Sequence, residues 1–148
     1  MVSDSISAVL RHKTGPVRSI SPDASVYDAV KMMAENSIGA VLVVSEGILS
    51  GILSERDYAR KVVLHSRSSK DTLVRDIMTT PVFSVTPSHT VEECMRLMTE
   101  NRIRHLPVLE GRTIVGVVSI GDLVKWVVNR QVETIQHLQD YIHGRYPA

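Results

Sequence analysis

An internal repeat limits the fold of this chain more than any other feature of its sequence. When residues 17–63 are laid over residues 82–128 without a gap, many identical residues coincide. The coincident pairs include Val17 with Val82, Ser19 with Ser84, Pro22 with Pro87, Val26 with Val91, Met33 with Met98, Gly51 with Gly116, Ser54 with Ser119 and Asp57 with Asp122. Because a solenoid usually needs three or more repeats to bury its faces, two copies predict a closed pair of similar domains.

Both copies predict the same order of elements. A short extended segment (17–20 or 82–85) is followed by Ser25-x-x-Asp28 or Thr90-x-x-Glu93, and each of these patterns is a capping box at a helix start. Two runs rich in β-branched residues follow, at 40–44 and 48–53 and at 105–109 and 113–118, and they predict hairpins. A second helix then begins at Ser54 or Ser119. The predicted unit is β-α-β-β-α, twice, an α/β (α+β) fold in which the two units pack as a pseudo-two-fold pair.

The predicted boundaries are 7–66 for the first domain, 72–130 for the second and 131–148 for a C-terminal helical tail. The polar segment 65–70 predicts a linker. Pro107 cannot donate a ladder hydrogen bond, so its strand is expected at an edge. In the tail, Val132, Ile135, Leu138 and Ile142 form a helical stripe with no counterpart after the first copy. This stripe either packs on its own domain or contacts a second chain.

Composition argues against several classes of function. The formal net charge is +1 and the basic residues are scattered, which argues against a polynucleotide partner. One Trp and one Phe leave little for base stacking. A single cysteine, Cys94, cannot form an intrachain disulfide and indicates a reducing compartment. Without an apolar run of ~20 residues or a signal-peptide pattern, we expect a cytoplasmic protein with no membrane contact.

Four segments of the sequence resemble a known family. Residues 101–108 (NRIRHLPV) and 114–123 (IVGVVSIGDL) are similar to the signature of the CBS domain, named after cystathionine β-synthase. Residues 52–57 (ILSERD) are the first-copy counterpart, and residues 76–82 (DIMTTPV) resemble the opening of a second CBS domain. The resemblance spans roughly residues 7–128. It implies a tandem pair that binds an adenosine ligand such as AMP, ATP, ADP or NAD in clefts between its domains. It also implies a homodimer that signals to an effector protein.

The candidate binding residues lie where strands meet helices. Ser54-x-x-Asp57 and Ser119-x-x-Asp122 place a hydroxyl and a carboxylate at a helix N-terminus, which favours anions. The same pattern is also a capping box, so a purely structural role stays open. The resemblance implies that Asp57 and Asp122 accept bonds from ribose hydroxyls and that the serines contact ribose or phosphate.

Cations are expected to hold the phosphate of the ligand. Arg104 and His105, and Arg56 in the first copy, could supply charge-assisted hydrogen bonds, although a solvated surface is the alternative for each. The resemblance places the adenine near five residues, Val17, Arg18, Thr80, Pro81 and Val82. Gly39-Ala40 stand in the first copy where Arg104-His105 stand in the second. The two sites are therefore expected to differ.

Nothing in the sequence indicates catalysis. It contains no HExxH, no nucleophile elbow and no Cys-His metal spacing. We therefore expect no enzyme, no metal and no catalytic cofactor, only a regulatory ligand. Two alternatives are kept: a structural or interaction module with unoccupied clefts, and a small hydrolase with Asp57 or Asp122 as base.

Overall fold

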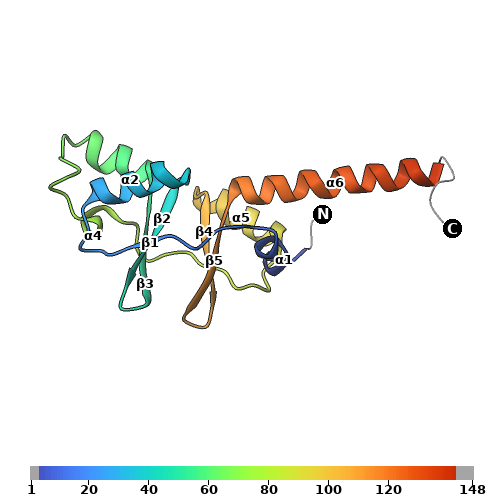
Figure 1. The fold of residues 1–148 in the computed structure, drawn as a ribbon, viewed down its shortest axis with the longest axis horizontal. Helices are drawn as coiled ribbons and strands as arrows, with labels where there is room; N and C mark the ends of the chain where they lie inside the picture. Colours follow the sequence, from blue (N-terminus) through green and yellow to red (C-terminus); the bar gives the residue numbers. More distant parts are fainter. Residues whose placement is uncertain (1–3, 143–148) are drawn as a thin grey trace. The chain divides into compact units, whose positions relative to one another are not determined.

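A computed structural model of the protein describes residues 4–142 (Figure 1). The helices are α1 (Ile6–Arg11), α2 (Val26–Asn36), α3 (Glu55–Tyr58), α4 (Val74–Ile77), α5 (Val91–Asn101) and α6 (Ile120–Ile142), with a π-helical segment η1 (Ala59–Val63). The strands are β1 (Ser19–Ile20), β2 (Ala40–Ser45), β3 (Ile48–Ser54), β4 (His105–Glu110) and β5 (Thr113–Ser119). The predicted mixture of helix and strand is confirmed, as are both hairpins and the helix after each of them.

The chain forms two compact units that do not follow the order of the sequence. The first unit comprises the residues up to Thr14, Pro87–Leu106 and the segment from Val118 onward. The second unit comprises Gly15–Thr86 and Pro107–Val117. Helix α1, which precedes the first copy of the repeat, therefore belongs to the unit that holds α5 and α6 of the second copy.

The second unit is built on the sheet β1-β2-β3. Strand β1 pairs in parallel with β2, and β2 pairs antiparallel with β3 across the turn at Glu46 and Gly47, both of which have positive φ. Helix α2 places one apolar face on this sheet because its buried residues recur at helical spacing. The core consists of Val26, Ala29, Met33, Val41, Val43, Leu53, Val62, Val74 and Ile77.

The first unit buries the matching face of α5 together with α1. Its buried residues include Ile6, Val9, Val91, Cys94, Met98, Leu106 and Leu123. The chain before α1 is tied to α5 and α6 by Asp4, whose carbonyl accepts from Val91 N–H at 2.9 Å and whose carboxylate accepts from Trp126 Nε1 at 2.9 Å. The sequence reasoning had not identified α1 as a helix.

Helices α2 and α5 begin at the predicted caps. At the start of α5 the Thr90 hydroxyl accepts from Glu93 N–H, and the Glu93 carboxylate accepts from Thr90 N–H, each at 3.0 Å. At the start of α2 the Ser25 hydroxyl accepts from Asp28 N–H at 3.1 Å. Hydroxyl capping is therefore seen at both helices, and the reciprocal box is complete at Thr90.

Pro107 breaks the symmetry of the two sheets. In the first copy Leu42 N–H donates to the Arg18 carbonyl, and β1 extends along β2. Pro107 stands at the position equivalent to Leu42 and has no N–H to donate. The equivalent pairing shrinks to a single parallel bridge between Val85 and Val108, and β4 and β5 form a two-stranded sheet. The prediction that β4 is an edge strand is therefore correct for the two-stranded sheet. Val85 bridges the side of β4 that does not pair with β5.

The predicted tail continues α6 without a break to Ile142, and residues 143–148 lie outside the described part of the chain. Within residues 4–142, no helix combines the length and the apolar character that a bilayer crossing requires.

Candidate functional site

The two Ser-x-x-Asp motifs adopt the same local geometry. Each serine ends a strand, β3 or β5, and its hydroxyl accepts from the N–H of the aspartate at 3.1 Å. Each serine N–H donates back to the aspartate Oδ2, at 2.9 Å in Ser54 and 2.8 Å in Ser119. The capping interpretation is therefore correct for both motifs. It leaves open the ligand interpretation, because a carboxylate has about four lone-pair positions.

Asp57 in the second unit is surrounded by donors. Its Oδ2 accepts from the N–H and hydroxyl of Ser54, while its Oδ1 accepts from Thr79 Oγ1 at 3.1 Å and lies 3.1 Å from Lys61 Nζ. Lys61 is held in place because Nζ also donates to the Ile77 carbonyl at 2.9 Å. Only 12% of the Asp57 side chain is exposed. This carboxylate therefore joins α3 to the segment that opens the second copy.

Asp122 in the first unit is more open, with 28% of its side chain exposed. Its Oδ2 accepts from Ser119 N–H and from Lys13 Nζ, the latter at 2.8 Å. Burial raises the pKa of this carboxyl, but the hydrogen bonds from Lys13 and Ser119 outweigh it, so the pKa of Asp122 lies below its ordinary value. Asp122 is therefore ionised at neutral pH beside a cation.

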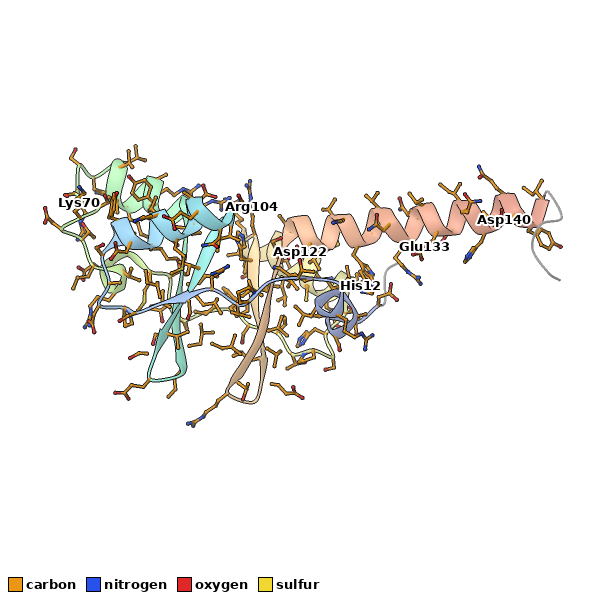
Figure 2. All side chains as sticks on the ribbon, in the orientation of Figure 1. His12, Lys70, Arg104, Asp122, Glu133 and Asp140 are labelled. Atoms are coloured by element: carbon orange, nitrogen blue, oxygen red, sulfur yellow. The ribbon has the colours of Figure 1, made fainter. Side chains whose placement is uncertain are left out.

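Arg104 and His105 join the same group from the start of β4. The Arg104 carbonyl accepts from Ile120 N–H at 2.8 Å, which fixes this end of β4 to the start of α6. Burial lowers the pKa of His105, the Lys13 and Arg104 cations lower it further, and Asp122 acts in the opposite direction. His105 is therefore a neutral imidazole at neutral pH. We call Lys13, Arg104, His105, Ser119 and Asp122 the second-copy cluster; Figure 2 labels Arg104 and Asp122.

The segments expected to hold adenine lie in the second unit. Thr79, whose hydroxyl bonds Asp57, also pairs with Ile52, and it leads directly into exposed Thr80 and Pro81 and half-buried Val82. The peptide bond between Thr80 and Pro81 is cis. The structure thus brings Thr79, the residue before the 80–82 segment, to the Asp57 motif, where Arg56 is half-buried.

The other expected adenine segment, Val17 and Arg18, is also assigned to the second unit. Val17 is 43% exposed, and the Arg18 carbonyl accepts from Leu42 N–H. The residues of the second-copy cluster belong to the first unit.

Three polar residues were missed by the sequence reasoning: Lys13, Lys61 and Thr79. Carrying the repeat alignment upstream would have pointed to Thr79, because it pairs Thr14 with Thr79 and Pro16 with Pro81. The same alignment sets Lys13 opposite Met78. Met78 is apolar and packs at Gly51, where an added Cβ would lie 2.7 Å from its Sδ. The substitution of a lysine for this methionine thus distinguishes the two copies.

No group of three or more His, Cys, Asp or Glu side chains suited to a metal ion occurs within residues 4–142.

Comparison with known proteins identifies the family. The CBS domain family matches residues 6–64 and 74–129. The mitochondrial CBS domain-containing protein CBSX3 of Arabidopsis thaliana is 45% identical over 153 residues, which cover 97% of this chain and 74% of the relative. A structure of a putative signal-transduction protein with CBS domains from Burkholderia ambifaria is 51% identical, with a TM-score of 0.83, and the match covers 86% of this chain and 96% of that one.

A more distant structure shares the fold. The CBS domain pair of protein MJ0100, in complex with 5′-methylthioadenosine and S-adenosyl-L-methionine, is 22% identical, with a TM-score of 0.77 over 86% of this chain and 98% of that one. Each of the two family matches covers one copy of the repeat, and together they cover most of the sequence. Two successive CBS domains therefore account for the internal repeat. This chain therefore belongs to the CBS domain family and carries a tandem pair of CBS domains.

Proposed function

We propose that this chain is a sensor that binds an adenosine nucleotide at the second-copy cluster and passes its occupancy to a partner protein. CBS domain pairs are regulatory and signal-transduction modules. Support for an adenosine ligand comes from protein MJ0100, whose CBS pair holds two adenosine compounds. AMP, ADP, ATP and NAD are the candidate ligands, because the cluster combines a carboxylate with cations.

The observation that carries the proposal is the contact of Lys13 with Asp122, in a cluster where the Arg104 carbonyl bonds the start of α6. An ionised carboxylate such as that of Asp122 can accept hydrogen bonds from two vicinal ribose hydroxyls. Lys13 and Arg104 supply positive charge for a phosphate within the same cluster. With two permanent cations against one carboxylate, the cluster favours a ligand that carries negative charge.

The first-copy motif is proposed to be a weaker site. Four donors, the Ser54 N–H and hydroxyl, Thr79 Oγ1 and Lys61 Nζ, already contact the Asp57 carboxylate. A ribose would have to displace some of them, and each broken contact to a charged group costs about 1.5–3 kcal/mol. Asp57 therefore acts mainly as a structural anchor for the 79–82 segment, and ligand held by Ser54, Arg56 and Asp57 is bound more weakly.

Isothermal titration of the purified protein with AMP, ADP, ATP, NAD and adenosine tests this proposal. We expect binding of the phosphorylated ligands, and we expect Asp122→Ala to weaken it at least tenfold while Asp57→Asn has a smaller effect. S-adenosyl-L-methionine and 5′-methylthioadenosine belong in the same series. If none of these compounds binds at ~1 mM, the chain is an interaction module with unoccupied clefts.

CBS domain pairs are generally regulatory and not catalytic. We propose the same for this chain, so that ATP incubated with it stays intact. We also propose a cytoplasmic homodimer that contacts an effector protein and neither nucleic acid nor membrane. Product analysis after incubation with ATP tests the hydrolase alternative, in which Asp57 or Asp122 would act as base.

A further inference from the structure

The distal half of α6 carries apolar side chains that its own unit does not cover. Every residue from Gln131 to Gln139 is exposed. Along the helix, the exposed fraction is 50% for Val128, 59% for Val132, 55% for Ile135, 58% for Leu138 and 75% for Ile142. In Figure 2 Glu133 and Asp140 mark this part of α6.

This stripe is not an extension of the helix face that packs on the first unit. Leu123 is buried, Trp126 Nε1 donates to Asp4 Oδ2, and Arg130 Nε lies 3.0 Å from the same oxygen, so these three residues mark the packed face. At about 100° per residue, the stripe through Val128, Ile135 and Ile142 lies more than a third of a turn away from that face. The uncovered residues therefore form a separate surface.

The distal half of α6 would gain stability from a partner. Most helical stability in proteins comes from packing an apolar face. The residues from Gln131 to Ile142 continue α6 beyond its packed face, and almost all of them are exposed, so they gain little of this stabilisation within their own unit.

The spacing of the stripe indicates what the partner is. In a heptad register, Val128, Ile135 and Ile142 occupy successive a positions. Val124, Gln131 and Leu138 occupy successive d positions, so the seam is apolar except at Gln131. β-Branched residues at a with Leu at d favour two-stranded coiled coils. The charged residues stay off this seam: Arg130 pairs with Glu133 at 3.1 Å on the other side of the helix. A seam of this kind is complementary to an identical seam, as a two-fold dimer requires.

The surface is also large enough for a dimer. Covering the exposed parts of the five seam residues Val124, Val128, Ile135, Leu138 and Ile142 would bury on the order of 500 Å² per chain, or roughly 1,000 Å² for the pair, which is the least that a specific interface needs. We propose that α6 pairs with α6 of a second copy of this chain through the seam of Val124, Val128, Ile135, Leu138 and Ile142. This proposal does not depend on nucleotide binding.

Sedimentation equilibrium of the full chain tests the proposal. We expect the native chain to be dimeric at ~10 μM and Ile135→Lys/Leu138→Lys to weaken the dimer at least a hundredfold. Asn129→Lys/Gln136→Lys is the matched control, because it adds the same charge to the same helix away from the seam. The control should remain dimeric. Circular dichroism verifies that all three proteins keep the helix and strand content of the two units.

Three results would overturn the proposal. A native chain that is monomeric at this concentration would show that the stripe does not bind a second copy. A dimer that persists in Ile135→Lys/Leu138→Lys would place the contact on another surface. Equal weakening in the control pair would likewise reject the seam, because net charge rather than the seam would then govern association.

Discussion

Lys13 Nζ lies 2.8 Å from Asp122 Oδ2, although 109 residues separate the two in the chain. In the first copy, Asp57 instead receives Lys61 from its own helical segment at i+4. Because the side chains of Lys13 and Asp122 are 39% and 28% exposed, their ion pair contributes little to folding, about 0–1 kcal/mol. The significance of Lys13 therefore lies in the positive charge that it adds to the second-copy cluster.

Met78 is the counterpart of Lys13 in the other copy, so Lys13→Met removes the positive charge and keeps an unbranched side chain. We expect Lys13→Met to weaken AMP binding about tenfold, because a charge-assisted contact to phosphate is worth roughly 1.5–3 kcal/mol. Adenosine, which lacks the phosphate, should bind as before. Titration calorimetry measures both ligands, and Lys125→Met, an exposed lysine of α6, is the control. An equal loss for AMP and adenosine would show that Lys13 does not act on the phosphate.

The two aspartates should respond differently to mutation. Asp122→Ala should weaken nucleotide binding at least tenfold and lower the free energy of unfolding by less than Asp57→Ala does, because the Asp122 side chain is 28% exposed and its ion pair with Lys13 contributes about 0–1 kcal/mol. Asp57→Ala should lower the free energy of unfolding by about 1–3 kcal/mol, because it leaves the Thr79 hydroxyl and the Ser54 N–H without their acceptor. Urea denaturation and calorimetry on both variants measure these effects. Equal losses of stability would reject the anchor role of Asp57.

Local signals allowed most elements to be predicted from the sequence. The cap at Thr90 and Glu93 could be identified because both partners lie within one helical turn. The hairpins could be identified because β-branched runs flank a short turn. Helix α1 has too few residues for a periodic signal, and its place depends on Asp4 reaching Val91 and Trp126.

The site could be predicted only in part, because some of its contacts join residues that are distant in the sequence. Asp57 and Asp122 share one motif, and the donors that distinguish them come from Thr79 and Lys13, distant in sequence. Reading each motif alone therefore predicted similar chemistry for both. In the sequence, only Arg104 and His105 indicated that the two sites differ. In the structure, the contacts of Asp57 are a second difference between them.

The thiol of Cys94 should be unreactive in the folded chain. Burial, with a smaller contribution from the neighbouring Glu93, raises the pKa of Cys94 to about 11, so little thiolate is present at pH 8. The residue is also fully buried against the core of the first unit. We expect a thiol reagent such as a disulfide dye to label it only after unfolding in urea. Rapid labelling of the native protein at pH 8 would indicate that α5 opens locally.

His105 should make the stability of the protein fall in mild acid. Burial lowers the pKa of His105 in the folded state, and Lys13 and Arg104 add to this effect. The unfolded chain, with a pKa near 6.5, then binds the proton more readily than the folded chain. The stabilising effect of the neutral imidazole is complete above about pH 6.5 and is lost as the pH falls through the folded-state pKa. Thermal unfolding between pH 7.5 and 5 should show a smaller loss for His105→Gln than for the native chain.

The same residue should make AMP binding stronger in acid and weaker as the pH rises. A phosphate beside His105 favours the protonated ring, so its pKa in the complex exceeds the lowered value of the ligand-free protein, and binding takes up a proton between the two values. An imidazole with the reference pKa of ~6.5 would place this loss at roughly pH 6 to 8. Because the ligand-free pKa is lowered, the loss should begin at a more acidic pH. Phosphate ionisation overlaps this range, so adenosine and the His105→Gln variant are the necessary comparisons. If the native chain and His105→Gln show the same pH dependence for AMP, His105 does not contact the phosphate, and Lys13 and Arg104 alone supply the charge.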